Sequence, residues 1–379
     1  MNERIGVGVI GTGFMGRCHA QAWRNVRAVF DDVPTPDLVA ICDSDSAAGQ
    51  AAVASYGFAR AETDWRRLID DRAIGAISIT TPNALHAEMA IAALQAGKHV
   101  WCEKPMALTL DQARAMGNAA AAAPGHTLLG YNYGRNPLIG TARRLIKAGE
   151  IGRVVHVRGC FDEDYMASAA LPWSWRCRAA DAGLGALGDL ACHLVATLHA
   201  LVGPIARVRG DMETVHRLRP MPGDPSANGA VENEDVGQAL VRFANDATGV
   251  LATSRVAWGR KNHLAWEVHG TRGTLAFDQE RMNELRLFTP DGPAETQGFR
   301  TILMGTAHPS FARFVPATGH GLGFNELKVI EAAEFLHAIV GGSPASPSFA
   351  EGFVVEQVIH AIAASAATGE WTATAGEGH

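Results

Sequence analysis

The feature that most constrains this chain is a glycine-rich motif close to its N-terminus. Residues 11–16 read Gly-Thr-Gly-Phe-Met-Gly and directly follow a short apolar run, Ile5 to Ile10. Where a strand leads into a helix, the first glycine of such a motif permits a tight turn, the second lets backbone N–H groups approach a pyrophosphate, and the third permits close helix packing. The motif therefore predicts a dinucleotide-binding βαβ unit. Its expected cofactor-binding residues are Gly11, Gly13, Phe14, Met15 and Gly16.

Short β-branched runs alternate with helical patterns over the first 130 residues, which is typical of a doubly wound parallel sheet. The helix boundaries agree with this pattern. Residues 83–96 have apolar i, i+3, i+4 spacing and end at Gly97, and Thr109 opens an alanine-rich helix with a capping-box pattern. The predicted strands are Ile5 to Ile10, Leu38 to Cys42, Ala76 to Ile79, His99 to Cys102 and Thr127 to Leu129.

The pattern changes after about residue 131. Between residues 205 and 288 strand patterns dominate, with turn signals at Asn245-Asp246 and Thr271-Arg272-Gly273, which predicts a large, open, mostly antiparallel sheet. Residues 217–233 and 290–324 are rich in Pro and Gly, and we expect them to be long loops. The other expected elements are a helix at residues 137–147, a strand at 154–160, a helix from near Gly188, and helices at 325–339 and 350–366.

A length of 379 residues exceeds what a single hydrophobic core usually serves, so two domains are expected. We predict the α/β class, with an N-terminal Rossmann domain at residues 1–130. A C-terminal α/β domain, for substrate binding and oligomerisation, is expected at residues 131–379, with the last helices packing back.

Charge and apolar patterning exclude several classes of partner. The net charge is −6 and no run of five like charges occurs, so nucleic acid is not an expected partner. No apolar stretch approaches the roughly 18 residues of a membrane span, and no secretion signal precedes the first strand. Six scattered cysteines without a CxxC pair fit neither a zinc knuckle nor a disulfide framework. We expect a soluble, cytoplasmic protein with reduced thiols.

The choice of cofactor depends on Asp43, which ends the second predicted strand. It lies 27 residues after Gly16 (43 − 16), close to the spacing of the acid that binds a ribose 2′-hydroxyl. A 2′-phosphate would be repelled there, and no Arg or Lys follows before Arg60, so NAD is favoured over NADP. The alternative is that Asp43 only caps the helix starting near Ser46.

Polar residues also follow the other predicted strands. Ligands of doubly wound sheets bind along the carboxyl edge of the strands, so these residues are expected to converge on the cofactor. Besides the glycine motif they are Asp43, Ser44, Thr81, Pro82, Asn83, His86, Glu103 and Lys104.

Three motifs together resemble the Gfo/Idh/MocA family of glucose-fructose oxidoreductase and inositol dehydrogenase. They are the glycine motif, Glu103-Lys104-Pro105, and Gly188-Asp189-Leu-Ala-Cys-His193. The resemblance covers essentially the whole chain. Residues 172–176, 298–301 and 307–309 are most similar to the family branch of levoglucosan dehydrogenase and the scyllo-inositol/L-glucose dehydrogenases.

The resemblance implies a Rossmann domain, a second domain whose open sheet mediates oligomerisation, often to a tetramer, and no metal. It also implies that Lys104, Asp189 and His193 act on a substrate hydroxyl. Loose alignment with family patterns adds candidate substrate-binding residues, which are Asn132, Tyr133, Asp164, Arg176 and His320.

The chemistry of the three catalytic candidates fits oxidation of an alcohol. Histidine titrates near neutral pH, so His193 is the expected base, and Asp189 shares its helix face at i, i+4 spacing. Lys104 would stabilise developing alkoxide charge. Taken alone, a Lys-Pro pair is more often a solvated strand end, and a histidine on an apolar helix is more often a core residue. The shared motif context favours catalysis.

We therefore expect an NAD-dependent dehydrogenase that oxidises a ring secondary alcohol of an inositol, a monosaccharide or an anhydro sugar. Two alternatives stay open. One is an enzyme that keeps its NAD and cleaves a glycosidic bond through transient oxidation. The other is a sugar- and dinucleotide-sensing regulator without turnover.

Overall fold

The computed structural model describes residues 3–374, and they divide into two compact units. The first unit comprises the chain up to Arg135 together with Gly323–Phe353. The second comprises Asn136–Leu322 and the residues from Val354 onward. The expected boundary near residue 130 stays a prediction, and each unit is described by itself below.

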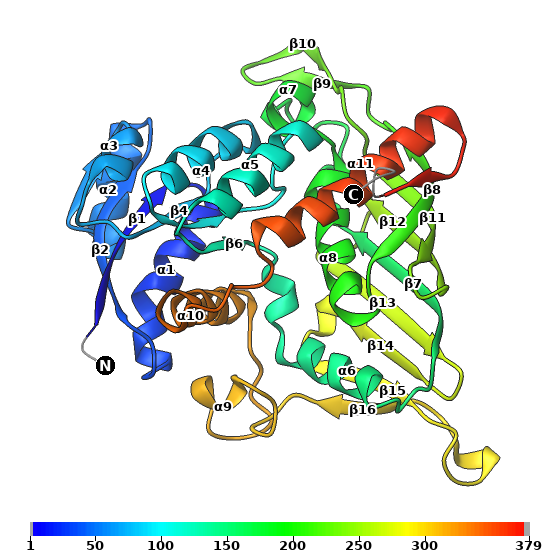
Figure 1. Cartoon of the computed structure of the whole chain (residues 1–379). Helices are drawn as coiled ribbons and strands as arrows, with labels where there is room; N and C mark the ends of the chain where they lie inside the picture. The colour runs from blue at the N-terminus through cyan, green and yellow to red at the C-terminus, as the bar shows by residue number, and fades with distance from the viewer. Residues whose placement is uncertain (1–2, 375–379) are drawn as a thin grey trace. The chain divides into compact units, whose positions relative to one another are not determined.

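A six-stranded parallel sheet forms the centre of the first unit. Its strand order is β3-β2-β1-β4-β5-β6, so the chain starts in the middle of the sheet and moves outward in both directions (Figure 1). This order is the standard one for a Rossmann domain and confirms the expected doubly wound sheet. The strands are β1 (Arg4–Ile10), β2 (Thr35–Cys42), β3 (Arg60–Glu62), β4 (Ala76–Ile79), β5 (His99–Cys102) and β6 (Thr127–Leu129).

Helix caps follow the sequence pattern closely in this unit. The Thr109 hydroxyl accepts a hydrogen bond from the backbone N–H of Gln112 at 3.2 Å, and Gly57 ends α2 with a φ of 79°. The C-terminal helix α10 packs on α1 through ring contacts of Phe14 with Phe324 and of Trp23 with Phe335. The helices are α1 (Phe14–Val29), α2 (Ser46–Tyr56), α3 (Arg66–Asp70), η1 (Asn83–Leu85), α4 (His86–Gln95), α5 (Leu110–Ala122), η2 (Asn132–Arg135) and α10 (Phe324–Gly341).

The second unit is built on a nine-stranded mixed sheet. Its order is β16-β15-β14-β13-β7-β12-β11-β8-β17, and only the β7–β12 pair is parallel, which confirms the mostly antiparallel prediction. The strands are β7 (Val154–Asp162), β8 (Ile205–Glu213), β11 (Val236–Phe243), β12 (Thr248–Ser254), β13 (His263–Gly270), β14 (Thr274–Asp278), β15 (Glu284–Phe288), β16 (Arg300–Leu303) and β17 (Thr372–Ala373).

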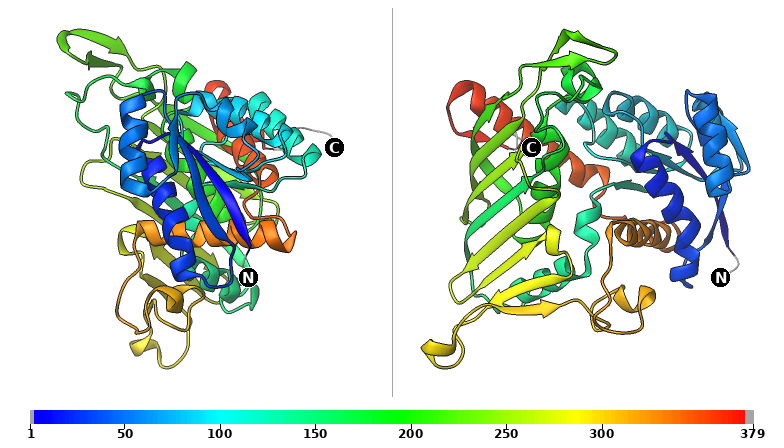
Figure 2. Two further views of the ribbon diagram at one scale, coloured as in Figure 1. Left: turned by 90° about the vertical axis from the view of Figure 1, so that its left-hand side faces the viewer. Right: turned by 180° about the vertical axis from the view of Figure 1, so that it is seen from behind.

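The longer helices of the second unit lie on one face of this sheet, and within the described residues the middle of the opposite face carries no helix (Figure 2). A side chain at Gly159 or Gly237 would collide with Leu194 or Leu187, so both glycines let the helical segment pack closely on the sheet. The helices are α6 (Pro137–Lys147), η3 (Trp175–Cys177), α7 (Ala179–Ala182), η4 (Leu187–Ala191), α8 (Cys192–Leu201), η5 (Gln279–Arg281), η6 (Ala294–Thr296), α9 (Phe311–Phe314) and α11 (Phe349–Thr368, which begins in the first unit).

The structure corrects the prediction that the two segments rich in Pro and Gly are long loops. Residues 217–233 contain a hairpin of β9 (Leu218–Met221) and β10 (Asp224–Ala230), and residues 290–324 contain β16, η6 and α9. The hairpin is fixed by tertiary contacts, because the Trp173 indole N–H donates to the Ala230 carbonyl at 2.8 Å and the Trp173 backbone N–H donates to Pro220. Local composition does not reveal such contacts.

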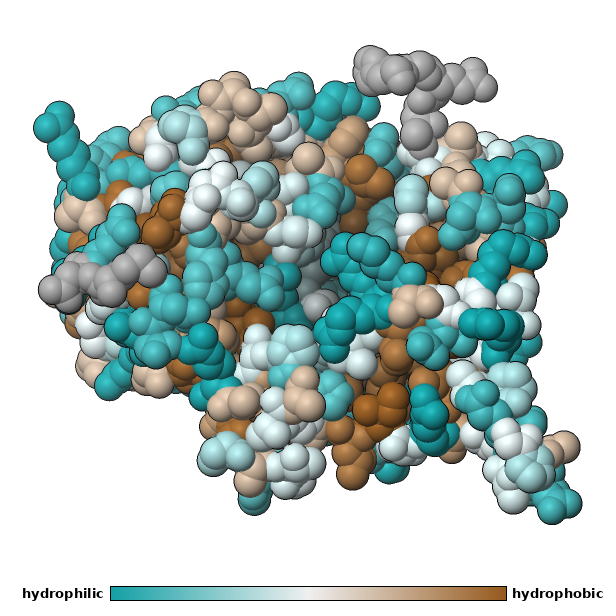
Figure 3. All heavy atoms as spheres, turned by 60° about the horizontal axis from the view of Figure 1, so that its bottom comes forward, coloured by the Kyte–Doolittle hydropathy of each residue, from teal (hydrophilic) through white to brown (hydrophobic). Residues whose placement is uncertain are grey.

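The segment Ala179–Leu201 has the length and apolar composition of a membrane span, but 72% of its apolar window is buried within the fold. This burial is the pattern of a core helix. On the face drawn in Figure 3, hydrophilic side chains cover most of the surface and hydrophobic ones form smaller patches among them. Such a distribution is typical of a surface in contact with water.

Candidate active site

The carboxyl edge of the parallel sheet collects the predicted cofactor-binding segments. Strands β1, β2, β4 and β5 run parallel to one another, so the loops that follow them emerge at the same edge. These loops begin at Gly11, Asp43, Thr80 and Glu103. The convergence expected from the sequence is therefore present in the topology of the first unit.

The glycine loop leaves open space at the N-terminus of α1. Gly11 has a φ of 101°, and a side chain there would collide with Thr80. A side chain at Gly16 would collide with the backbone of Gly11, whereas one at Gly13 would meet no atom within 4 Å. Gly13 is the N-cap residue and offers no side-chain cap, so the first backbone N–H groups of α1 suit a pyrophosphate. The loop residues fit a dinucleotide.

Asp43 is held at the mouth of this loop. Its Oδ2 accepts hydrogen bonds from the backbone N–H of Thr12 at 3.0 Å and from the Thr12 hydroxyl at 2.5 Å. The cap of α2 is Asp45, whose carboxylate accepts from Ala47 and Ala48, so Asp43 does not cap that helix. The half-buried Asp43 carboxylate suits a ribose hydroxyl, and Ser44 beside it is exposed.

The loops after β4 and β5 are tied together by His86. Its ring is fully buried, with Nδ1 2.9 Å from the Pro105 carbonyl oxygen and Nε2 3.0 Å from the Thr81 carbonyl oxygen. Burial lowers the pKa of His86, and the two backbone oxygens oppose that shift. His86 thus lies beneath the loops and positions them. Thr81 and Asn83 are half-buried, and Pro82 is exposed at the edge. The assignment of His86 as a cofactor contact stays a prediction.

Glu103 anchors the Glu-Lys-Pro segment through a network of buried charges. Its Oε1 lies 2.5 Å from Lys328 Nζ and 2.7 Å from His19 Nε2, and Lys328 also contacts the Glu331 carboxylate at 2.8 Å. A side chain at Gly130 would collide with the Glu103 carboxylate, which explains why a glycine follows β6. The half-buried Lys104 therefore follows directly after a residue whose side chain is fixed by buried ion pairs.

The protonation states of the groups in this network follow from burial and from the charges that each group contacts. Burial alone raises the pKa of Glu103, but the charge of Lys328 and the hydrogen bond from His19 outweigh it and leave the pKa lowered. Burial and then Lys328 lower the pKa of His19 to about 4. Burial raises the pKa of Glu331 to about 6. At neutral pH the network therefore holds a carboxylate at Glu103, an ammonium at Lys328 and a neutral imidazole at His19.

Asn132 and Tyr133 follow β6 at the same edge. Asn132 is 2% exposed, and its Nδ2 has no hydrogen-bond partner among residues 3–374. A buried amide N–H without an acceptor lowers the stability of the fold, so the oxygen of a bound ligand would supply the missing hydrogen-bond acceptor. Tyr133 is buried, and its ring contacts Phe324 edge-on.

Asp189 and His193 lie on a helix that begins with a widened turn. Residues Leu187–Ala191 form a π-helical turn that continues into α8, so i, i+4 spacing still corresponds to about one turn. Glu234 fixes the start of the turn, because its Oε1 accepts the Leu187 backbone N–H at 2.8 Å. His193 is 4% exposed, and its ring packs edge-on against Phe161 of β7 at 5.9 Å.

Tyr165 is a site residue that the sequence analysis missed. Its hydroxyl donates to Asp189 Oδ2 at 2.6 Å. Burial, followed by the charge of Asp189, raises the pKa of Tyr165 well above its usual range, so the phenol is a permanent donor. The two partners are 24 residues apart, and no local pattern connects them.

The remaining candidates of the second unit lie in different surroundings. Asp164 binds Lys261 Nζ at 2.5 Å and the Gly259 backbone N–H at 3.1 Å, so it holds the loop before β13. Arg176 is exposed and stacks on the Trp175 ring at 4.5 Å, and its charge acts on Tyr165, where it opposes the upward pKa shift. His320 is exposed on the loop before α10. The substrate roles of Asp164, Arg176 and His320 stay predictions.

The strand order, the glycine loop and the acid after β2 together define a dinucleotide-binding α/β protein. Residues 5–131 match the model of the oxidoreductase family with an NAD-binding Rossmann fold, and residues 139–276 match the GFO/IDH/MocA C-terminal domain. The chain belongs to the GFO/IDH/MocA family of oxidoreductases, as its motifs indicated, and its N-terminal domain is of the NAD-binding type.

Full-length relatives agree with this assignment. Levoglucosan dehydrogenase of Pseudarthrobacter phenanthrenivorans is 37% identical, covering 97% of this chain and 98% of that protein. A solved levoglucosan dehydrogenase in complex with NADH and levoglucosan superimposes with a TM-score of 0.95 at 37% identity, covering 99% of this chain and 100% of the other. An NAD-binding oxidoreductase from Klebsiella pneumoniae gives 0.94 at 39% identity, with the same coverage.

Proposed function

We propose that this protein is an NAD-dependent dehydrogenase that oxidises a ring secondary alcohol of a cyclic polyol or sugar, with levoglucosan, L-glucose and the inositols as the candidate substrates. The observation that carries the proposal is the presence of Lys104, Asp189 and His193 together in a chain that is similar over its full length to levoglucosan dehydrogenase. The buried Asn132 amide adds a polar group suited to a hydroxylated ligand.

The residues have separate roles in the proposed reaction. NAD, when bound, supplies the acceptor for the hydride that leaves the carbinol carbon. His193 takes the proton from the carbinol oxygen, since histidine is the side chain that titrates near neutral pH. The Lys104 ammonium stabilises the negative charge that develops on that oxygen. Asp189, fixed by Tyr165, binds an adjacent hydroxyl and orients the imidazole.

The first experiment follows NADH absorbance with NAD, and then with NADP, across levoglucosan, scyllo-inositol, myo-inositol and D- and L-glucose. We expect NAD-linked turnover of at least one of these compounds. NAD binding without NADH formation on any of them would contradict the proposal and favour the glycosidase-like or regulatory alternative.

A variant pair tests the assigned base. His193→Ala should lower kcat by roughly 10²-fold, as expected for loss of a general base, with NAD affinity nearly unchanged. His199→Gln is the matched control, because it removes another histidine from the same helix, and it should retain kcat at neutral pH. Equal kcat values for the two variants would remove His193 from the mechanism.

We also propose that the protein is a cytoplasmic homo-oligomer, with the open face of the nine-stranded sheet as the contact surface. The face presents apolar side chains, since Leu240 is 50% exposed, Val250 42% and Leu303 59%. Sedimentation of wild type and Leu240→Glu tests this assembly. A tetramer that dissociates in the variant is expected, and a wild-type monomer would contradict it.

A further inference from the structure

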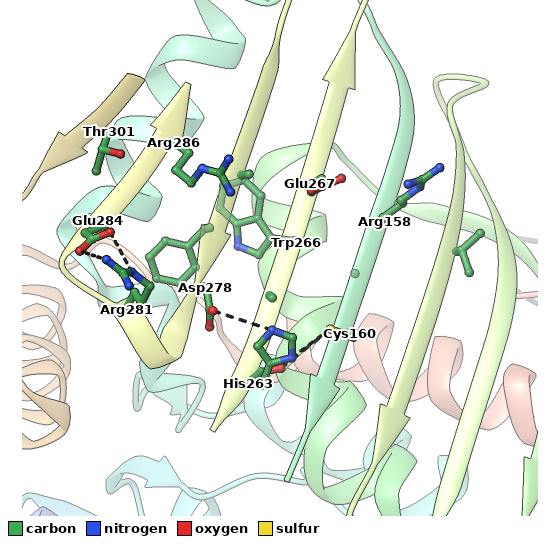
Figure 4. Close-up of a pocket in the computed structure, with 15 residues that line it drawn as sticks. Arg158, Cys160, His263, Trp266, Glu267, Asp278, Arg281, Glu284, Arg286 and Thr301 are labelled. Atoms are coloured by element: carbon green, nitrogen blue, oxygen red, sulfur yellow. Dashed lines mark hydrogen bonds and ion pairs between the residues drawn. The ribbon is translucent and has the colours of Figure 1, made fainter. Parts of the chain in front are cut away.

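The open face of the nine-stranded sheet carries a group of side chains that the dehydrogenase reaction does not use. Cys160 and Asp162 on β7 are two residues apart and therefore point to the same face. His263 on β13 is the register partner of Asp162, and Ala265 is the partner of Cys160. The three polar side chains lie close together, and Cys160 and His263 line a pocket of about 840 Å³ (Figure 4).

The distances among the three side chains suit a metal ion. Cys160 Sγ lies 3.5 Å from His263 Nδ1, and Asp162 Oδ2 lies 3.9 Å from the same nitrogen. All three ligand atoms lie within 4.8 Å of one another. A tetrahedral zinc ion, with bonds of about 2.3 Å to sulfur and about 2.0 Å to nitrogen, separates those two atoms by about 3.5 Å. The sulfur and nitrogen atoms therefore already lie at the separation that zinc requires.

The second nitrogen of His263 also has a partner of the right kind. Its Nε2 lies 3.8 Å from Asp278 Oδ2 on β14, and Figure 4 shows the ring between Cys160 and Asp278. Metal-binding histidines almost always donate their other N–H to a carboxylate, a backbone carbonyl or water, which fixes the tautomer and the ring orientation. Strands β7, β13 and β14 therefore supply both the ligands and the group that orients one of them.

A divalent ion binds the deprotonated forms of these side chains, a thiolate at Cys160 and a carboxylate at Asp162, and its charge would stabilise both.

We propose that Cys160, Asp162 and His263 bind a zinc ion, with water in the fourth position. A thiolate, an imidazole and a carboxylate are a ligand set that suits zinc, while magnesium and calcium prefer oxygen ligands alone. The site is separate from the oxidoreductase residues. Phe161, between the two β7 ligands, points to the helix-covered face and contacts His193 there, so zinc binding does not depend on the proposed dehydrogenase activity.

The test uses the untagged full-length chain purified from zinc-supplemented medium, with zinc per chain measured by elemental analysis after desalting. We expect about one zinc per chain. In cobalt-supplemented protein, a thiolate-to-cobalt charge-transfer band should appear. Cys160→Ser should abolish that band, and His263→Gln should lower metal affinity by at least about tenfold.

His269→Gln is the matched control, because His269 lies on the same strand and the same face as His263 but outside the cluster. It should bind zinc as the wild type does. Asp162→Asn provides a second ligand variant if His263→Gln folds poorly. Absence of zinc from the wild type, or equal zinc in the wild type, Cys160→Ser and Asp162→Asn proteins, would overturn the proposal.

Discussion

At the residue scale, Tyr165 supports Asp189 from a position outside any recognised motif. Removal of a hydrogen bond to a charged partner costs about 1.5–3 kcal/mol, or about 10- to 150-fold. Tyr165→Phe should therefore lower kcat/KM for the sugar within that range and leave the Kd for NAD unchanged. Steady-state kinetics and NAD titration measure both values. Tyr56→Phe, on α2, is the control, and an equal kcat/KM in both variants would show that Tyr165 is not a positioning residue.

Asp43 combines a structural contact with its predicted role in cofactor choice. Asp43→Ala should weaken NAD binding by about tenfold or more through the lost ribose contact, and NADP binding by much less. Calorimetric titration with both cofactors measures the difference. Thr12→Val separates the two roles, since it removes a hydrogen bond to Asp43 and keeps the carboxylate. Equal losses of NAD in the two variants would mean that Asp43 only shapes the loop.

At the element scale, α10 contributes a buried cation, Lys328, that pairs with Glu103 of the Glu-Lys-Pro segment. Lys328→Met leaves Glu103 and Glu331 buried without their ammonium partner, which costs about 3–5 kcal/mol for a broken buried pair. Urea denaturation should show a clearly lower midpoint. Adding Glu331→Gln should recover part of the loss, because it removes a buried carboxylate that has lost its ammonium partner.

Lys261→Met is the control for that experiment. Its side chain is 74% exposed, so the ion pair with Asp164 is screened by water and its loss should change the midpoint little. Similar midpoints for the Lys261 and Lys328 variants would mean that the buried network does not stabilise the fold.

The sequence predicted the elements whose signals are local. Strands β4, β5 and β6 begin and end where the patterns place them, and Thr109 caps α5 as its capping box indicates. The β9–β10 hairpin escaped prediction because it depends on distant partners. Arg219, for example, is fully buried and donates to the carbonyl oxygens of Ser168 and Met166.

The same distinction applies to the candidate site. The glycine loop and Asp43 follow strand ends, so spacing alone placed them at the cofactor edge. Tyr165, Lys328 and Glu234 act through partners 24 to 225 residues away, and only the fold brings them together. The widened turn at Asp189 likewise depends on a distant carboxylate that holds its first N–H group.

At the scale of the whole molecule, buried and partly buried histidines in both units make stability depend on pH. Burial lowers the pKa of His19, His99 and His199 to about 4 each. His99 and His199 also accept backbone N–H hydrogen bonds through a ring nitrogen, which protonation would break. The unfolded chain takes up these protons first, so stability is full above about pH 6.5 and is lost as the pH falls toward 4.

Glu331 opposes this trend, because its raised pKa lets the folded state bind a proton first as the pH falls through 6. Burial also raises the pKa of Glu234 and Asp162, and it lowers the pKa of His86 and His156. Five histidines therefore act against three carboxyl groups, and a net loss of stability between pH 7 and pH 5 is expected. One histidine with a pKa lowered from 6.5 to about 4 accounts for about 2 kcal/mol of that loss.

His199→Gln isolates one of these contributions. Glutamine can still accept the Ile205 backbone N–H but cannot titrate, so the variant should lose about 2 kcal/mol less than wild type between pH 7 and pH 5. Urea denaturation at the two pH values measures the difference. His320→Gln removes an exposed histidine and should follow the wild type. If His199→Gln also loses stability as the wild type does, the neutral, partly buried imidazole of His199 is not the source of the acid sensitivity.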